Sequence, residues 1–169
     1  MVKPSDVIVI GTIAAAGCAA AAIDLKTRRV PNALTLSLAA AGLAVAAAGI
    51  GRVSLAGSLA GLAIGVALML PGHLFGATGA GDVKLFGASG ALLGPAAIVA
   101  AFIYTAIAGG VLALVVALRR GRLQRTLGSA ARLVTGAAKA ADLEAATENN
   151  RFPFAPAIAV GAIVAAIGL

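Results

Sequence analysis

The chain has 169 residues, of which 61% are hydrophobic and only 4% aromatic, and it carries a formal net charge of +7. This composition argues against a water-soluble globular domain and predicts an all-α, polytopic membrane protein. Aromatic residues do not alternate with the basic ones, as they would in a protein that binds single-stranded nucleic acid. The expected surroundings are therefore membrane lipid, and no nucleic-acid partner is expected.

Five charge-free runs approach or exceed the roughly 20 residues that a membrane-spanning helix needs. They lie at residues 7–23, 33–51, 53–81, 85–118 and 152–169. The fourth is too long for one crossing, and Gly94-Pro95 should divide it, because proline favours helix starts and disfavours helix interiors. We therefore expect about six membrane helices, including a short one at 82–93 and a full span at 95–118. Together they would form one membrane-embedded domain, residues 1–169.

Basic residues predict the orientation, because short loops rich in Lys and Arg stay in the cytoplasm. If the end of the first helix is cytoplasmic, all 13 basic residues except Lys3 and Arg52 fall inside. The polar segment at about 119–151 then also lies inside. Its weak helical periodicity favours an amphipathic helix on the membrane surface, although a solvated connector helix explains it equally well.

Small residues recur through the third run, where Gly57, Gly61 and Gly65 are spaced four apart. This spacing lets two membrane helices approach closely. Packing is a sufficient explanation for these glycines.

Two acidic residues stand at helix ends, Asp24 at the end of the first helix and Asp82 at the start of the fourth. Counting the crossings puts both on the cytoplasmic side. Neighbouring carboxylates cannot both ionise cheaply, so they share a proton, and one can act as base toward water while the other acts as acid. This is the chemistry of aspartic proteases. Considered alone, the two acids could equally be ordinary charges at loop boundaries.

Glycines precede the second acid, in "GAGDVKL" (residues 79–85). Gly79 and Gly81 permit backbone conformations and close approaches that a side chain would block. Irregular backbone at membrane depth is tolerated only against protein or a water-filled cavity, and hydrolysis needs such water.

Three sequence segments together carry a resemblance to a known family. These are "DLKTRRVPN" (24–32), "GAGDVKL" (79–85) and "FPFAPAIAVGA" (152–162), which in this order resemble the type IV prepilin peptidases, membrane aspartic proteases with a GxGD motif. The resemblance implies that Asp24 and Asp82 are the catalytic pair. It implies a substrate too, a pilin-like precursor whose short basic leader is cut at the cytoplasmic face of a bacterial or archaeal inner membrane.

Longer members of that family carry a cytoplasmic segment with paired cysteines and methylate the new N-terminus, and nothing here corresponds to that segment. The chain thus resembles the short, peptidase-only kind associated with tight-adherence (Flp-type) pili, and methyltransferase activity is in doubt.

The supporting residues have simpler expected roles. Pro31 and Asn32 should start and cap the second helix. Lys84 should snorkel to the cytoplasmic interface rather than bind substrate or tune Asp82. His73, the only histidine, has no expected role because ligands for a metal are lacking nearby, and no metal or cofactor is expected.

Two other functions are compatible with parts of the sequence. "GASG" (87–90) resembles the serine motif of rhomboid proteases, which would make Ser89 a nucleophile, but no histidine follows it as a base. Alternatively, a non-catalytic transporter or membrane-assembly subunit would use the two acids to relay protons or bind a cation.

Overall fold

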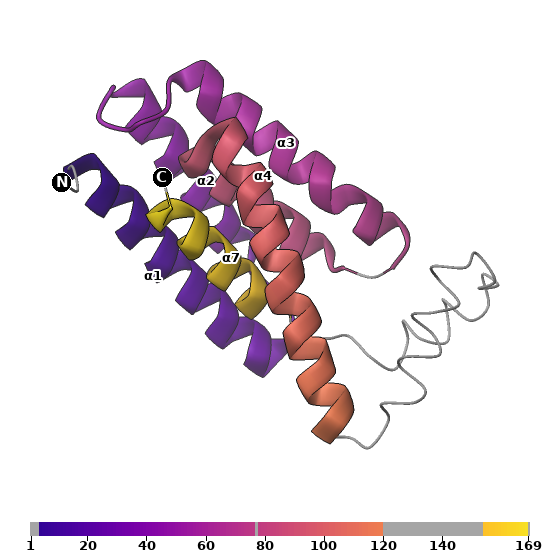
Figure 1. Ribbon diagram of the computed structural model, residues 1–169. Helices are drawn as coiled ribbons and strands as arrows, with labels where there is room; N and C mark the ends of the chain where they lie inside the picture. The colour runs from indigo at the N-terminus through magenta and orange to yellow at the C-terminus, as the bar shows by residue number, and fades with distance from the viewer. Residues whose placement is uncertain (1–3, 77, 120–153, 169) are drawn as a thin grey trace.

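The computed structural model describes residues 4–76, 78–119 and 154–168 (Figure 1). These residues form α1 (Pro4–Thr27), α2 (Asn32–Ala47), α3 (Leu55–Leu74), α4 (Ala80–Arg119) and α7 (Ala155–Ile167). The expected all-helical architecture is confirmed for this part of the chain. The expected amphipathic helix at 119–151 lies almost entirely outside the described residues.

The predicted break inside the fourth apolar run is present. Gly94 has φ 77° and ψ 179°, a conformation that only glycine adopts readily, and it interrupts α4 just before Pro95. The break divides α4 into a first segment, residues 80–93, and a second segment, residues 95–119. In Figure 1 the chain reverses direction here, so that the second segment runs back along the first.

Three of the described helices are long and apolar enough to cross a membrane, namely those containing Asp6–Thr27, Leu55–Leu74 and Ala80–Val116. α2 and α7 are apolar but have only 16 and 13 residues. α7 is shorter than its apolar run because it begins only at Ala155. Three helices therefore have the length and hydropathy that a membrane crossing needs. The total of about six crossings stays a prediction.

The first segment of α4 forms the centre of the bundle, and every residue from Leu85 to Gly94 is buried. α2, α3 and α7 pack against α4, and α7 also packs against α1. Many large apolar side chains elsewhere, such as Leu59, Ile103 and Ile107, are exposed. An outer surface of this kind suits lipid rather than water.

Small residues let α3 and α4 pack backbone to backbone, as the glycine spacing predicted. A Cβ at Gly61 would collide with the carbonyl oxygen of Gly90, and a Cβ at Gly65 would lie 3.0 Å from the Cα of Gly87. The Ser58 hydroxyl donates a 2.6 Å hydrogen bond to the Ala91 carbonyl across this contact. Since lipid tails give apolar side chains little reason to associate with each other, close packing and such hydrogen bonds hold membrane helices together.

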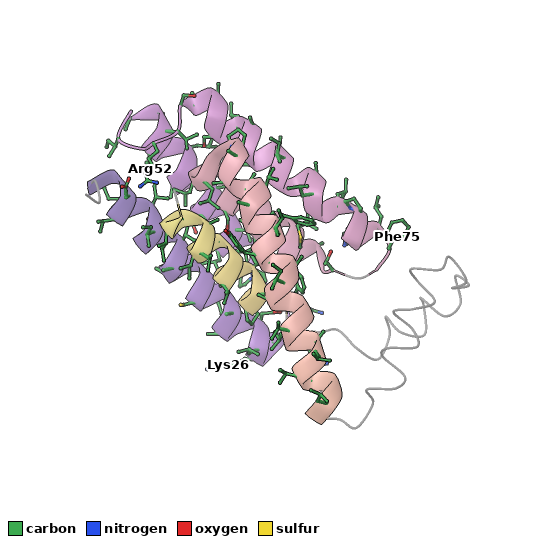
Figure 2. The ribbon with its side chains drawn as sticks, in the orientation of Figure 1. Lys26, Arg52 and Phe75 are labelled. Carbon is green, nitrogen blue, oxygen red and sulfur yellow. The ribbon has the colours of Figure 1, made fainter. Side chains whose placement is uncertain are left out.

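The two ends of the bundle carry different polar groups. Asp6 and Arg52 form an ion pair at one end. Figure 2 shows Arg52 at this end, with Lys26 and Phe75 at the other. Of the two basic residues that the predicted topology places outside, the structure describes only Arg52. It lies at the opposite end from Lys26, Arg28, Arg29 and Lys84, which the topology places inside.

The α3–α4 contact can be tested by adding one methyl group. Gly61→Ala should lower the melting temperature of the detergent-purified protein, because the new Cβ has no room beside Gly90. The matched control is Gly110→Ala, where a Cβ would meet nothing within 4 Å. Replacing a helical glycine with alanine where the space allows it is neutral or stabilising by up to about 1 kcal/mol. Equal melting temperatures for both variants would show that the backbone contact does not limit stability.

Candidate active site

The two acids singled out from the sequence are both buried, with relative exposures of 6% for Asp24 and 7% for Asp82. Asp24 lies in the last turn of α1, which continues to Thr27, one turn beyond the expected end. Asp82 lies in the first turn of α4. Both acids lie where the end of α1 and the loop after it meet the start of α4, so the fold brings the two segments together.

Asp82 is held by its own helix start. Its Oδ2 accepts a 3.1 Å hydrogen bond from the backbone N–H of Gly79, the residue before α4. This is the reciprocal half of a capping box, in which an acid in the first turn binds an otherwise unpaired N–H. A Cβ at Gly79 would lie only 3.2 Å from Oδ2. The first motif glycine therefore leaves room for the carboxylate.

Gly81 has a different neighbour, the loop that follows Asp24. A Cβ at Gly81 would lie 3.1 Å from the Cβ of Val30 and 3.4 Å from its backbone nitrogen and oxygen. The second motif glycine thus lets the loop after α1 pass close to the first turn of α4. This contact brings the segments that bear the two acids together.

Asp24 is held by a helix that lies 131 residues away along the chain. Its Oδ2 accepts a hydrogen bond of 3.3 Å from the backbone N–H of Ala155, the first residue of α7. Free N–H groups at a helix N-terminus and the helix dipole both favour a carboxylate. The sequence had suggested no role for Ala155, although Pro156 marks a helix start there.

Asn32 and Lys84 form a second link between the two segments. The Lys84 ammonium donates a 3.0 Å hydrogen bond to Oδ1 of Asn32. The expected cap by Asn32 was wrong: Pro31 occupies the N-cap position, and no side chain caps α2. Asn32 is instead the first helical residue, and its amide faces Lys84. The lysine is exposed, as snorkelling requires, but it also binds a protein partner.

Ser89, the nucleophile of the serine-protease alternative, and His73, the only histidine, both already have backbone partners. The Ser89 hydroxyl is buried and donates to the Leu85 carbonyl of its own helix, at 3.0 Å. His73 is exposed near the end of α3, and its Nδ1 lies 3.0 Å from the Thr78 carbonyl oxygen. Neither contact pairs a nucleophile with a base. Within the described ranges, no three His, Cys, Asp or Glu side chains gather where they could hold a metal ion.

Comparison with known proteins identifies the family. The model of the type IV leader peptidase family matches residues 11–114, which include both Asp24 and Asp82. The chain therefore belongs to the type IV leader peptidase family. No curated protein and no solved structure matches it.

The link between Asn32 and Lys84 predicts a measurable effect on peptidase activity. Lys84→Met keeps the length of the side chain but removes the hydrogen bond. The two segments that carry the acids should then shift relative to each other. An error of about an ångström in catalytic geometry can cost about a hundredfold in rate. We expect cleavage of a leader-bearing precursor to fall by about tenfold or more, while helicity by circular dichroism is unchanged.

The control for this prediction is Lys26→Met, which removes an exposed cation from the same end of the bundle. Asn32→Ala should reproduce the defect, and the double variant should be no slower than either single one, since both lose the same contact. Equal activity in Lys26→Met and Lys84→Met would contradict a positioning role for the link.

Proposed function

We propose that Asp24 and Asp82 are the catalytic pair of a membrane aspartic endopeptidase that removes a short N-terminal leader from pilin-like precursors. The observation that carries the proposal is the arrangement of two buried carboxylates at one end of the bundle, on segments that meet where Gly81 lies against Val30. Membership of a leader peptidase family supports the reaction class.

The mechanism follows from two carboxyl groups that hold one proton between them. The ionised carboxylate takes a proton from a water molecule, the water oxygen attacks the scissile carbonyl carbon, and the protonated carboxyl donates its proton to the carbonyl oxygen. As the C–N bond breaks, the first carboxyl passes its new proton to the amine nitrogen, and a hydroxyl of the intermediate returns a proton to the second carboxylate, which restores the starting state. The N–H groups of Gly79 and Ala155 each occupy one carboxylate oxygen, Oδ2 in both cases. Each Oδ1 is thereby left for water or substrate.

The proposal extends to the location and the substrate. The whole chain would form one membrane-embedded peptidase domain of about six crossings, with the aspartates at the cytoplasmic face of the inner membrane. Lys26, Arg28, Arg29 and Lys84 lie at the same end as the acids, which supports this orientation. The short, Flp-type class of precursor and the absence of N-methylation are proposed from the sequence resemblance alone.

The decisive test replaces each acid by its amide. In Asp24→Asn and Asp82→Asn the side-chain oxygen can still accept from the Ala155 or Gly79 N–H, so the fold should survive. The titratable group is lost, so cleavage of a purified precursor should become undetectable. Asp24→Asn plus Asp82→Asn should be no worse than either alone, because residues that act as one unit are not additive.

Two controls belong in the same assay. Asp6→Asn removes an acid that is also buried but lies at the opposite end, paired with Arg52. It should cleave the precursor even if it melts at a lower temperature. Ser89→Ala should cleave normally as well. Cleavage that survives in both amide variants but disappears in Ser89→Ala would favour a serine nucleophile and sink the aspartic mechanism.

The orientation has its own test. In a Cys18→Ala background, a cysteine at Thr27 should be shielded from an impermeant thiol reagent added to intact cells, whereas one at Ile50 should react. Both positions are exposed: Thr27 is the last residue of α1, and Ile50 lies after the far end of α2. Labelling at Thr27 from outside would put the acids on the wrong face for a cytoplasmic leader.

A further inference from the structure

An apolar groove lies beside α3 and the second segment of α4. It has a volume of about 450 Å³ and is lined by Ala67 and Pro71 of α3, by Phe102 and Ala106 of α4, and by Thr78 and Phe154. α3 and this segment touch near the kink, where a Cβ at Gly61 would lie 2.8 Å from the Cα of Gly94. Figure 1 shows that they separate toward the other end.

Two lining residues connect the groove to the acids. Thr78 immediately precedes Gly79, whose N–H binds Asp82, and Phe154 immediately precedes Ala155, whose N–H binds Asp24. The groove thus ends one residue from each of the two backbone groups that hold the carboxylates. Asp24 and Asp82 themselves do not line the groove, so a ligand lying in it must extend beyond it to reach the acids. Another cavity, of about 380 Å³, lies at the opposite end beside Asp6 and Arg52 and has no such connection.

The lining indicates the chemical class of the occupant. Among the described residues, no charged side chain lines the groove, which disfavours a charged headgroup or leader residue. The Thr78 hydroxyl is buried and forms no hydrogen bond within the part of the chain that the structure describes, although buried hydroxyls normally have a partner. Its backbone is already bonded, through N–H to Gly72 and through C=O to His73. A peptide offers apolar side chains together with carbonyl acceptors, whereas the hydrocarbon tail of a lipid offers no acceptor.

We propose that this groove binds the apolar segment of the peptide substrate that adjoins the scissile bond. The assignment rests on the proposed function and adds the place where the substrate is held. Phe154 forms one wall, and its ring lies against α4, where a Cβ at Gly109 would come within 2.6 Å of it. The Thr78 hydroxyl donates to a backbone carbonyl of the bound segment.

Filling the groove tests the assignment. Ala67 and Ala106 are exposed lining residues, so phenylalanine can be placed there without displacing the core. We expect Ala67→Phe and Ala106→Phe to raise the KM for the precursor by about tenfold to a hundredfold, the scale on which a pocket discriminates between apolar groups. The matched controls are Ala56→Phe on α3 and Ala113→Phe on α4, both exposed and outside the groove. These should keep the KM of the unsubstituted protein.

Thr78→Val tests the hydroxyl separately. Valine has nearly the same shape, and removing an unpaired buried hydroxyl should not lower the melting temperature of the free protein. The KM should nevertheless rise by about threefold to tenfold, the usual size of one lost hydrogen bond. A lower melting temperature with an unchanged KM would assign the hydroxyl a purely structural role and remove it from the proposal.

Crosslinking separates failure of the groove from failure of the proposed function. A photoreactive phenylalanine at position 106 of the Asp82→Asn variant should form an adduct with the precursor, and the same residue at position 113 should not. Adducts with lipid alone would overturn the groove assignment. Normal cleavage by both Ala67→Phe and Ala106→Phe, in an assay where Asp82→Asn is inactive, would also overturn the groove assignment. The proposed function would then stand. A precursor that crosslinks at position 106 but is never cleaved would uphold the groove and count against the peptidase mechanism.

Discussion

Both buried carboxylates are held by backbone N–H groups at helix starts. Asp24 binds the N-terminus of α7, and Asp82 binds the N-terminus of α4. In an apolar bundle a carboxylate without a hydrogen-bond donor is costly to bury, and so is a free N–H. The first residue of α7 and the residue before α4 offer such donors, and Asp24 and Asp82 accept from them. Each contact satisfies both partners, so two acids can lie buried at one end of the bundle, where no basic side chain of the described residues forms an ion pair with them.

This arrangement requires helices that approach closely, and the small residues of the chain provide the space. Gly61 meets Gly90 between α3 and α4, and Gly17 on α1 would place a Cβ 2.9 Å from that of Ala159 on α7. The second contact fixes α7 beside α1, and its N-terminus consequently lies beside Asp24. Close packing along the bundle thus determines the position of a donor at its end.

Local features could be predicted from the sequence, and contacts between distant segments could not. Gly94-Pro95 combines a residue tolerant of positive φ with one that starts helices, so the break in α4 was predictable. Counting crossings was enough to place Asp24 and Asp82 at one end. The bonds from Ala155 to Asp24 and from Lys84 to Asn32 join residues 131 and 52 positions apart. Their formation depends on how the helices rotate about their axes, which weak periodicity in an apolar chain does not specify.

The distribution of polar groups also bears on the choice between a peptidase and a proton or cation relay. A relay needs titratable or hydrated groups that continue from one face of the membrane to the other. Of the described acids, the remaining one, Asp6, pairs with Arg52 at the far end, and buried side chains between the ends include Phe86 and Ile98. The hydroxyls of Ser58 and Ser89 in this interior are bonded to backbone carbonyls. Among the described residues, the charged side chains are therefore confined to the two ends of the bundle, as suits a site that acts on a substrate arriving at one face.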